Sequence, residues 1–186
     1  PYDLLAKAIT ETHERVPEMH RNARPDEKPA TAPEVRVPKA TLGASDGLAG
    51  WAKRGAYIPY TSDISFADLY ACETEDGIAL MLRADDYMDA RIYEDKKLPA
   101  SDYMAGTFSF GEGASPITVR FAAGARATVD DERVRLLHND KGLRQVVIAV
   151  IPRSAIIGEM PLAFTCTATG YTGYMTTTWK ATLQRG

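Results

Sequence analysis

The sequence predicts an all-β domain, an antiparallel β-sandwich that follows a short N-terminal helix and a linker. From residue 35 onward, short segments with apolar residues at every second position recur, and clusters of Gly, Pro, Asp and Asn separate them. No segment of helical period longer than a turn or two stands out in that region. The chain has 186 residues, 45% of them hydrophobic and 25% charged, as is typical of a folded globular domain.

Residues 1–34 differ in composition from the rest of the chain, and we expect them to form a helix and a proline-rich linker. Apolar residues recur at helical spacing within residues 3–20. Pro17 is expected to end or kink this helix, because proline removes a backbone hydrogen bond there. A helix of this length needs a surface to pack on. It is therefore either the tail of a preceding domain or a strap across residues 35–186.

The strands expected in residues 35–186 include a hairpin near the start. Residues 66–73 and 78–85 are its two predicted strands. Asp76-Gly77 between them suits a tight turn, because glycine readily adopts positive φ. Further strands are expected at residues 107–110, 117–121, 126–129, 134–138, 143–151, 162–169 and 175–183.

Charge and motif content exclude several functional classes. The formal net charge is −3 and the pI is about 5.7, so the chain offers no basic face to a nucleic-acid backbone. Its longest apolar stretch, residues 145–152, is much shorter than the ~20 residues that span a bilayer. The sequence contains no nucleotide-binding loop, dinucleotide fingerprint or nucleophile elbow. The histidines, His13, His20 and His138, have no partners at metal-ligand spacing.

The cysteines and tryptophans have structural interpretations. Cys72 and Cys166 could join two strands through a disulfide, or they could lie buried as free thiols, and the sequence leaves both open. Trp51 and Trp179 are expected to fill the core, where large apolar side chains contribute most to packing.

Tyrosines give the clearest indication of a binding surface. Nine tyrosines outnumber five phenylalanines, and a tyrosine ring offers an apolar face to a sugar while its hydroxyl meets water. Several tyrosines fall in expected loops or at strand ends, where binding residues usually lie. The candidate stacking residues are Tyr87, Tyr103, Tyr171 and Tyr174. The candidate polar partners for sugar hydroxyl groups are Arg83, Arg91 and Asn139.

An acidic run follows the second strand of the predicted hairpin. Asp85, Asp86 and Asp89 supply oxygen ligands that suit calcium, which accepts them in variable number. A solvated acidic loop is the simpler interpretation of the same residues. The acidic run thus has two interpretations, a structural calcium site and a solvated loop.

Ordered motifs run through residues 35–186. An Asp-Gly pair followed by a tryptophan ends at Trp51, and the hairpin over residues 67–86 comes next. Ser101-Asp102 then precedes a strand. The last motifs are the strands over residues 145–152, 162–169 and 179–183. In this order the motifs resemble those of family 9 carbohydrate-binding modules and their DOMON-like relatives.

The resemblance implies a jelly-roll sandwich without catalytic activity, usually attached to a secreted polysaccharide-degrading enzyme. It implies an extracellular or periplasmic location and a polysaccharide or oligosaccharide as partner, together with a catalytic domain in the same parent chain. Two tryptophans clamp the sugar in such modules. Here the corresponding segments offer Tyr103 in one case, and Tyr171 and Tyr174 in the other. Val147 or Ile148 replaces the glutamate of the family's strand motif.

Two functions therefore remain for the sandwich. The first is a carbohydrate-binding module that stacks a sugar on loop tyrosines. The second is a structural accessory domain of a glycoside hydrolase with no ligand of its own, which the missing clamp tryptophans favour. An independent enzyme would need a carboxylate pair such as Asp85 with Asp102, and the sequence shows no further sign of one. We expect no catalytic residues.

Overall fold

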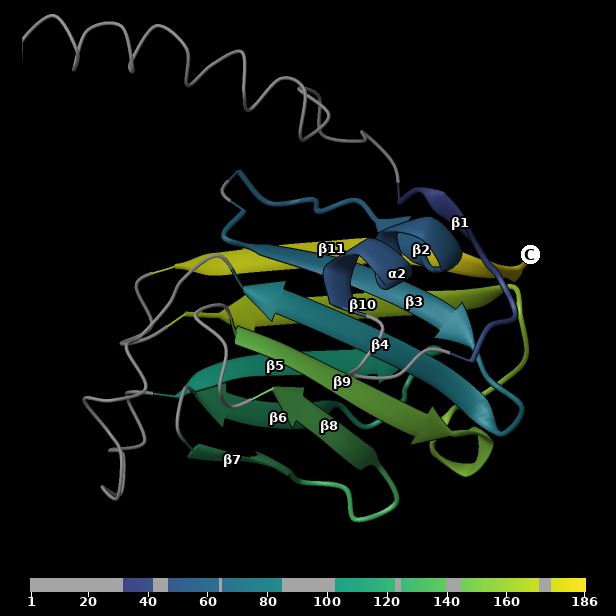
Figure 1. Ribbon diagram of the computed structural model, residues 1–186. Coiled ribbons are helices and arrows are strands. Elements are labelled where there is room, and N and C mark those ends of the chain that lie inside the picture. Colours follow the sequence, from purple (N-terminus) through teal and green to yellow (C-terminus); the bar gives the residue numbers. More distant parts are fainter. Residues whose placement is uncertain are drawn as a thin grey trace, which may run out of the picture. The chain divides into compact units, whose positions relative to one another are not determined.

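Two β-sheets pack face to face in the computed structural model (Figure 1). The structure describes residues 32–41, 47–63, 65–84, 103–122, 125–139, 145–170 and 175–186. The arrangement confirms the predicted β-sandwich. The helix and most of the linker predicted over residues 1–34 lie outside the described residues. Within the described part of the chain, no helix is long and apolar enough to cross a membrane.

The first sheet, sheet A, has six strands in the order β1-β11-β10-β5-β6-β7. Its strands are β1 (Glu34–Val37), β5 (Met104–Phe110), β6 (Ile117–Ala122), β7 (Ala125–Val129), β10 (Leu162–Thr169) and β11 (Thr176–Arg185). β1 pairs with β11 in parallel, whereas the other neighbours in the sheet are antiparallel. The predicted antiparallel sandwich is thus confirmed, and the edge strand β1 adds one parallel pair to it.

The second sheet, sheet B, has five strands in the order β2-β3-β4-β9-β8, all antiparallel to their neighbours. Its strands are β2 (Ala56–Ile58), β3 (Ala67–Glu73), β4 (Gly77–Ala84), β8 (Arg135–Asn139) and β9 (Gln145–Pro152). Every residue of β4 is buried, because this central strand is covered on both faces. A short 3₁₀ turn, η3 (Arg153–Ala155), follows β9.

The main core lies between the sheets. Inward-facing residues of both contribute to it, among them Leu69 and Leu80 of sheet B and Phe108 and Phe164 of sheet A. Trp179 of β11 is also completely buried in this core, as the sequence predicts. In β10, buried and exposed residues alternate along almost the whole strand, which explains why the period-two pattern predicts residues 162–169 with the observed bounds.

A second, smaller apolar cluster covers the outer face of sheet B. The helix α2 (Gly47–Arg54) contributes Trp51, which is fully buried against Cys72, Met81 and Ile148. The N–H of Gly55, the residue after the helix, donates to the carbonyl oxygen of Trp51 over 2.7 Å and so completes the last helical turn. Trp51 is thus a core residue as predicted, although it fills the outer cluster rather than the space between the sheets.

The hairpin of β3 and β4 is confirmed, but the predicted reason for its glycine is wrong. Three residues, Thr74 to Asp76, separate the two strands, and the N–H of Thr74 donates to the carbonyl oxygen of Gly77 over 2.9 Å. Gly77 is not among the described glycines with positive φ, which are Gly111, Gly113 and Gly158. A side chain at Gly77 would instead overlap the carbonyl oxygen of Ile151 in β9. The glycine is needed for close packing of two strands.

Both cysteines are free and buried. Cys72 belongs to the outer cluster, whereas Cys166 points into the main core between the sheets. The structure thus places them on opposite sides of sheet B and supports the free-thiol interpretation.

Candidate binding site at one end of the sandwich

The strand ends that flank the predicted binding residues meet at one end of the sandwich. In sheet B, Ala84 at the end of β4 pairs with both Ala67 and Gln145. In sheet A, Thr169 at the end of β10 pairs with Ala105. The ends of β4 and β10 both lie on the left of Figure 1. We call this end of the sandwich the Ala84 end.

Two hydrogen bonds join the sheets near the Ala84 end. The N–H of Phe66, just before β3, donates to Oγ1 of Thr177 in β11 over 3.1 Å. The N–H of Thr61 donates to the carbonyl oxygen of Thr178 over 2.7 Å. Because these bonds connect the segment between β2 and β3 with the start of β11, the corresponding ends of the two sheets lie together.

Most of the predicted binding residues belong to stretches that begin or finish at the Ala84 end. Residues 85–102 follow β4 and precede β5, residues 140–144 join β8 to β9, and residues 171–174 join β10 to β11. These stretches lie outside the described residues. They include the candidates Tyr87, Arg91, Tyr171, Tyr174, Asp85, Asp86 and Asp89. Chain continuity nevertheless attaches all three stretches to the same end of the sandwich.

Two further candidates, Tyr103 and Asn139, are described and stand at the Ala84 end. Tyr103 directly precedes β5 and is partly buried. Asn139 is the last residue of β8 and pairs with Val146 of β9. The strand register thus brings together the flanks of residues that are far apart in sequence. Their contacts with a ligand stay a prediction.

Arg83 lies next to the Ala84 end but is largely enclosed. Its side chain is only 8% exposed, and its Nη1 donates to Oδ2 of Asp68 over 2.7 Å in a salt bridge across β3 and β4. A close ion pair of this kind fixes the direction of the guanidinium. Asp68 could not be predicted as the partner of Arg83 from the sequence, because the pairing depends on the register of β3 and β4.

Two tyrosines that no sequence pattern singles out, Tyr57 and Tyr70, lie on the same face of sheet B as Asp68 and Arg83. The rings of Tyr57 and Tyr70 are neighbours on β2 and β3, with centroids 5.4 Å apart and planes tilted by 59°. Partial burial raises the pKa of the Tyr70 hydroxyl, and the Asp68 carboxylate raises it further, while Arg83 opposes the shift. Tyr70 therefore stays protonated beyond the pH at which an ordinary tyrosine ionises.

The described residues contain no group of three or more His, Cys, Asp or Glu side chains that could hold a metal ion. The calcium candidates Asp85, Asp86 and Asp89 lie outside those residues, so their role stays a prediction. Because both tryptophans are fully buried, an aromatic platform for a ligand has to come from tyrosine or phenylalanine.

Comparison with known proteins finds matches among solved structures, but none among family models or curated sequences. A family 9 carbohydrate-binding module from Caldicellulosiruptor kristjanssonii, in complex with glucose, superposes with a TM-score of 0.54. The match has 12% sequence identity and covers 82% of this chain and 96% of the module.

A second structure of such a module, also from Caldicellulosiruptor kristjanssonii and in complex with cellotriose, gives a TM-score of 0.52. The match has 10% identity and covers 82% of this chain and 94% of the module. The fold is like that of family 9 carbohydrate-binding modules. This confirms the jelly-roll sandwich that the ordered motifs predict, and at such low identity the likeness concerns the fold.

Proposed function

We propose that this protein is a non-catalytic carbohydrate-binding module whose ligand site lies at the Ala84 end. The observation that carries the proposal is the strand register, which attaches every stretch with a predicted binding residue to that end. The likeness in fold to modules that hold glucose and cellotriose is consistent with this role. We further propose that the module serves a secreted polysaccharide-degrading enzyme in the same parent chain.

Sugar binding at this end rests on tyrosine rings with polar groups beside them. A pyranose presents C–H groups on its faces, and these pack on an aromatic ring while its hydroxyl groups reach polar side chains. Tyr103 would supply one ring, and Tyr87, Tyr171 and Tyr174 are candidates for others. The largely enclosed Asp68–Arg83 pair lies beside this end and joins the neighbouring strands β3 and β4.

The first test is calorimetric titration of the full chain with glucose, cellotriose and a panel of plant polysaccharides. We expect binding, and we expect Tyr103→Ala to weaken it about tenfold or more, because truncated aromatic anchors at a binding site cost ~2 kcal/mol. Tyr103→Phe keeps the ring and should retain most of the affinity. Ile157→Ala truncates an exposed apolar side chain at the opposite end of the sandwich, where its N–H bonds to the carbonyl oxygen of Phe110, and this control should leave binding unchanged.

Single changes at Tyr87, Tyr171 and Tyr174 extend the same experiment to the remaining ring candidates. If no sugar of the panel gives heat of binding, the proposal fails and a structural accessory domain becomes the better account. Equal losses in Tyr103→Ala and Ile157→Ala would place the ligand elsewhere.

A further inference from the structure

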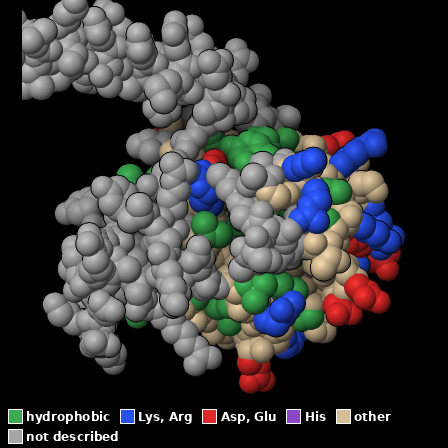
Figure 2. All heavy atoms as spheres, viewed as in Figure 1, with side chains coloured by type: hydrophobic (Ala, Val, Ile, Leu, Met, Phe, Trp, Pro, Cys, Tyr) green, Lys and Arg blue, Asp and Glu red, His purple; other side chains and the backbone are tan. Residues whose placement is uncertain are grey.

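A polar pocket lies at the opposite end of the sandwich from the Ala84 end. Its volume is about 580 Å³, within the usual range for small-molecule sites. We call it the Glu73 pocket. Its walls come from the end of β3, the segment after β1, the η3 turn and the end of β11, which contribute Glu73, Lys39, Arg153 and Arg185. Figure 2 shows Lys and Arg side chains together with Asp and Glu side chains on the right of the described surface.

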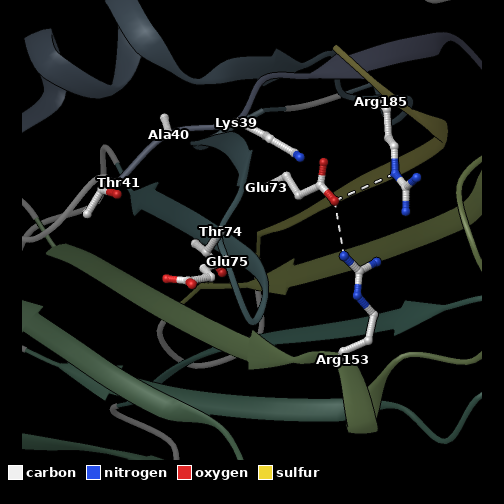
Figure 3. Close-up of a pocket in the computed structure, with 8 residues that line it drawn as sticks. All are labelled: Lys39, Ala40, Thr41, Glu73, Thr74, Glu75, Arg153 and Arg185. Atoms are coloured by element: carbon white, nitrogen blue, oxygen red, sulfur yellow. Dashed lines mark hydrogen bonds and ion pairs between the residues drawn. The ribbon is translucent and has the colours of Figure 1, made fainter.

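Backbone contacts hold the wall of the pocket in place. The N–H of Glu73 donates to the carbonyl oxygen of Pro38 over 2.8 Å, and the N–H of Ala40 donates to that of Glu73 over 3.0 Å. This bridge fixes Lys39 beside Glu73. In Figure 3 the charged groups of Lys39, Arg153 and Arg185 turn toward the carboxylate of Glu73. Backbone hydrogen bonds of the fold therefore hold this wall of the pocket in a fixed position.

The carboxylate of Glu73 is buried, and only one of its two oxygen atoms accepts a hydrogen bond. Its side chain is 4% exposed. Oε1 accepts a hydrogen bond from Nη2 of Arg153 over 3.0 Å and lies 3.7 Å from Nε of Arg185. Oε2 is buried without a hydrogen-bond partner, and so is Oγ1 of Thr74, the next residue along the chain. Buried polar atoms are nearly always paired in folded proteins, so these two mark a place where a ligand's polar groups fit.

Three cations, Lys39, Arg153 and Arg185, line the pocket together with two carboxylates, Glu73 and the exposed Glu75. Lys39 is exposed, and among the described residues no acidic side chain forms an ion pair with it. The side chains of Arg153 and Arg185 are 41% and 58% exposed, so parts of both side chains stay open to solvent. A planar guanidinium suits a carboxylate because it can donate two parallel hydrogen bonds.

We propose that the Glu73 pocket binds a hydroxylated carboxylate, such as a uronic acid residue. The carboxylate of the ligand would pair with Lys39 and the exposed side of Arg185. Hydroxyl groups on the same ring would donate to Oε2 of Glu73 and exchange hydrogen bonds with Oγ1 of Thr74. A neutral sugar would leave the cations unpaired, whereas a simple anion would leave Oε2 of Glu73 without a donor. This second site goes beyond the proposed function, because it lies at the other end of the sandwich.

The test is a titration of the ¹⁵N-labelled full chain with D-glucuronate, followed by amide chemical shifts and calorimetry. We expect saturable shifts around Thr74 and Arg153, with weaker or absent effects from D-glucose and from acetate at equal concentration. Glucose and acetate each carry one half of the proposed ligand chemistry. If acetate binds there as well as glucuronate does, the pocket is a general anion site and the proposal is wrong.

Two variants assign the binding to the pocket. Lys39→Ala removes an exposed cation, and Thr74→Val removes the unpaired hydroxyl while keeping the side-chain shape. We expect each to weaken glucuronate binding about tenfold, the scale of one charge-assisted or buried hydrogen bond. Lys53→Ala, an exposed lysine on α2, is the matched control and should have no effect.

Besides equal binding of acetate, either of two further results would overturn the proposal. One is the absence of saturable shifts with glucuronate, and the other is unchanged affinity in both Lys39→Ala and Thr74→Val. Failure of this test is distinguishable from failure of the proposed function, because Tyr103→Ala should alter glucose binding without altering glucuronate binding at the Glu73 pocket.

Discussion

Gly77 illustrates how one residue determines the spacing of strands in this sandwich. It begins β4, where the backbone of β9 approaches so closely that a side chain would overlap the carbonyl oxygen of Ile151. Cores filled beyond their natural volume lose stability because neighbouring strands must shift. The effect of Gly77 is therefore on packing, and the β3–β4 connection itself does not require a glycine with positive φ.

The first residue-scale prediction concerns Gly77→Ala. We expect it to lower the free energy of unfolding by about 3 kcal/mol, at the upper end of the range for overpacked sites, as measured by urea denaturation. Gly113→Ala is the control. Gly113 has a φ of 75° but nothing within 4 Å of an added Cβ, so only backbone strain of about 1 kcal/mol should appear. Equal losses in the two variants would show that packing against β9 is not the cause.

The second residue-scale prediction concerns the buried thiols. Burial raises the pKa of Cys166, so its thiol stays protonated in the folded protein above about pH 8.5, where an unfolded cysteine ionises. Its contribution to stability is present below that pH and is lost as the pH rises above it. We expect neither Cys72 nor Cys166 to react with a thiol reagent at pH 8 in the native protein, and both to react in guanidinium. Rapid labelling of the native protein would contradict their burial.

At the scale of elements, α2 covers part of the outer face of sheet B. The uninterrupted burial of β4 requires apolar packing on both of its faces, and Trp51 supplies the largest side chain on the outer one. Most of the stability of so short a helix comes from this packing, because eight residues are too few for a stable isolated helix.

We therefore predict that Trp51→Ala lowers the free energy of unfolding by about 3–5 kcal/mol, the usual cost of removing a buried tryptophan. Lys53→Ala on the exposed side of the same helix should change it by less than about 0.5 kcal/mol. Urea denaturation followed by circular dichroism measures both. A loss below about 1 kcal/mol for Trp51→Ala would mean that α2 does not stabilise sheet B.

Strands with strict alternation were predictable, and short or doubly covered elements were less so. The period-two pattern places the strand over residues 162–169 correctly, since one face of β10 is buried and the other exposed. β5 starts at Met104, three residues before its prediction, because Ala105 and Gly106 give no strand signal. α2, with eight residues, and β2, with three, are too short for a periodic pattern, and neither was expected.

At the scale of the whole molecule, the candidate residues were predictable but their common position was not. Residue type and loop composition single out Tyr103, Arg83 and Asn139 in the sequence. Only the pairing of β4 with β9 and of β10 with β5 shows that the stretches around them share one end of the sandwich. The same topology places the Glu73 pocket at the other end, so the two proposed sites can be tested independently.

Sugar binding at the Ala84 end is tested most directly by amide chemical-shift mapping of the ¹⁵N-labelled full chain with cellotriose. The largest shifts should therefore fall on Arg83, Tyr103, Asn139 and Gly170, while Thr74 and Arg153 stay unchanged. Shifts confined to Thr74 and Arg153, or no saturable shifts at all, would contradict it.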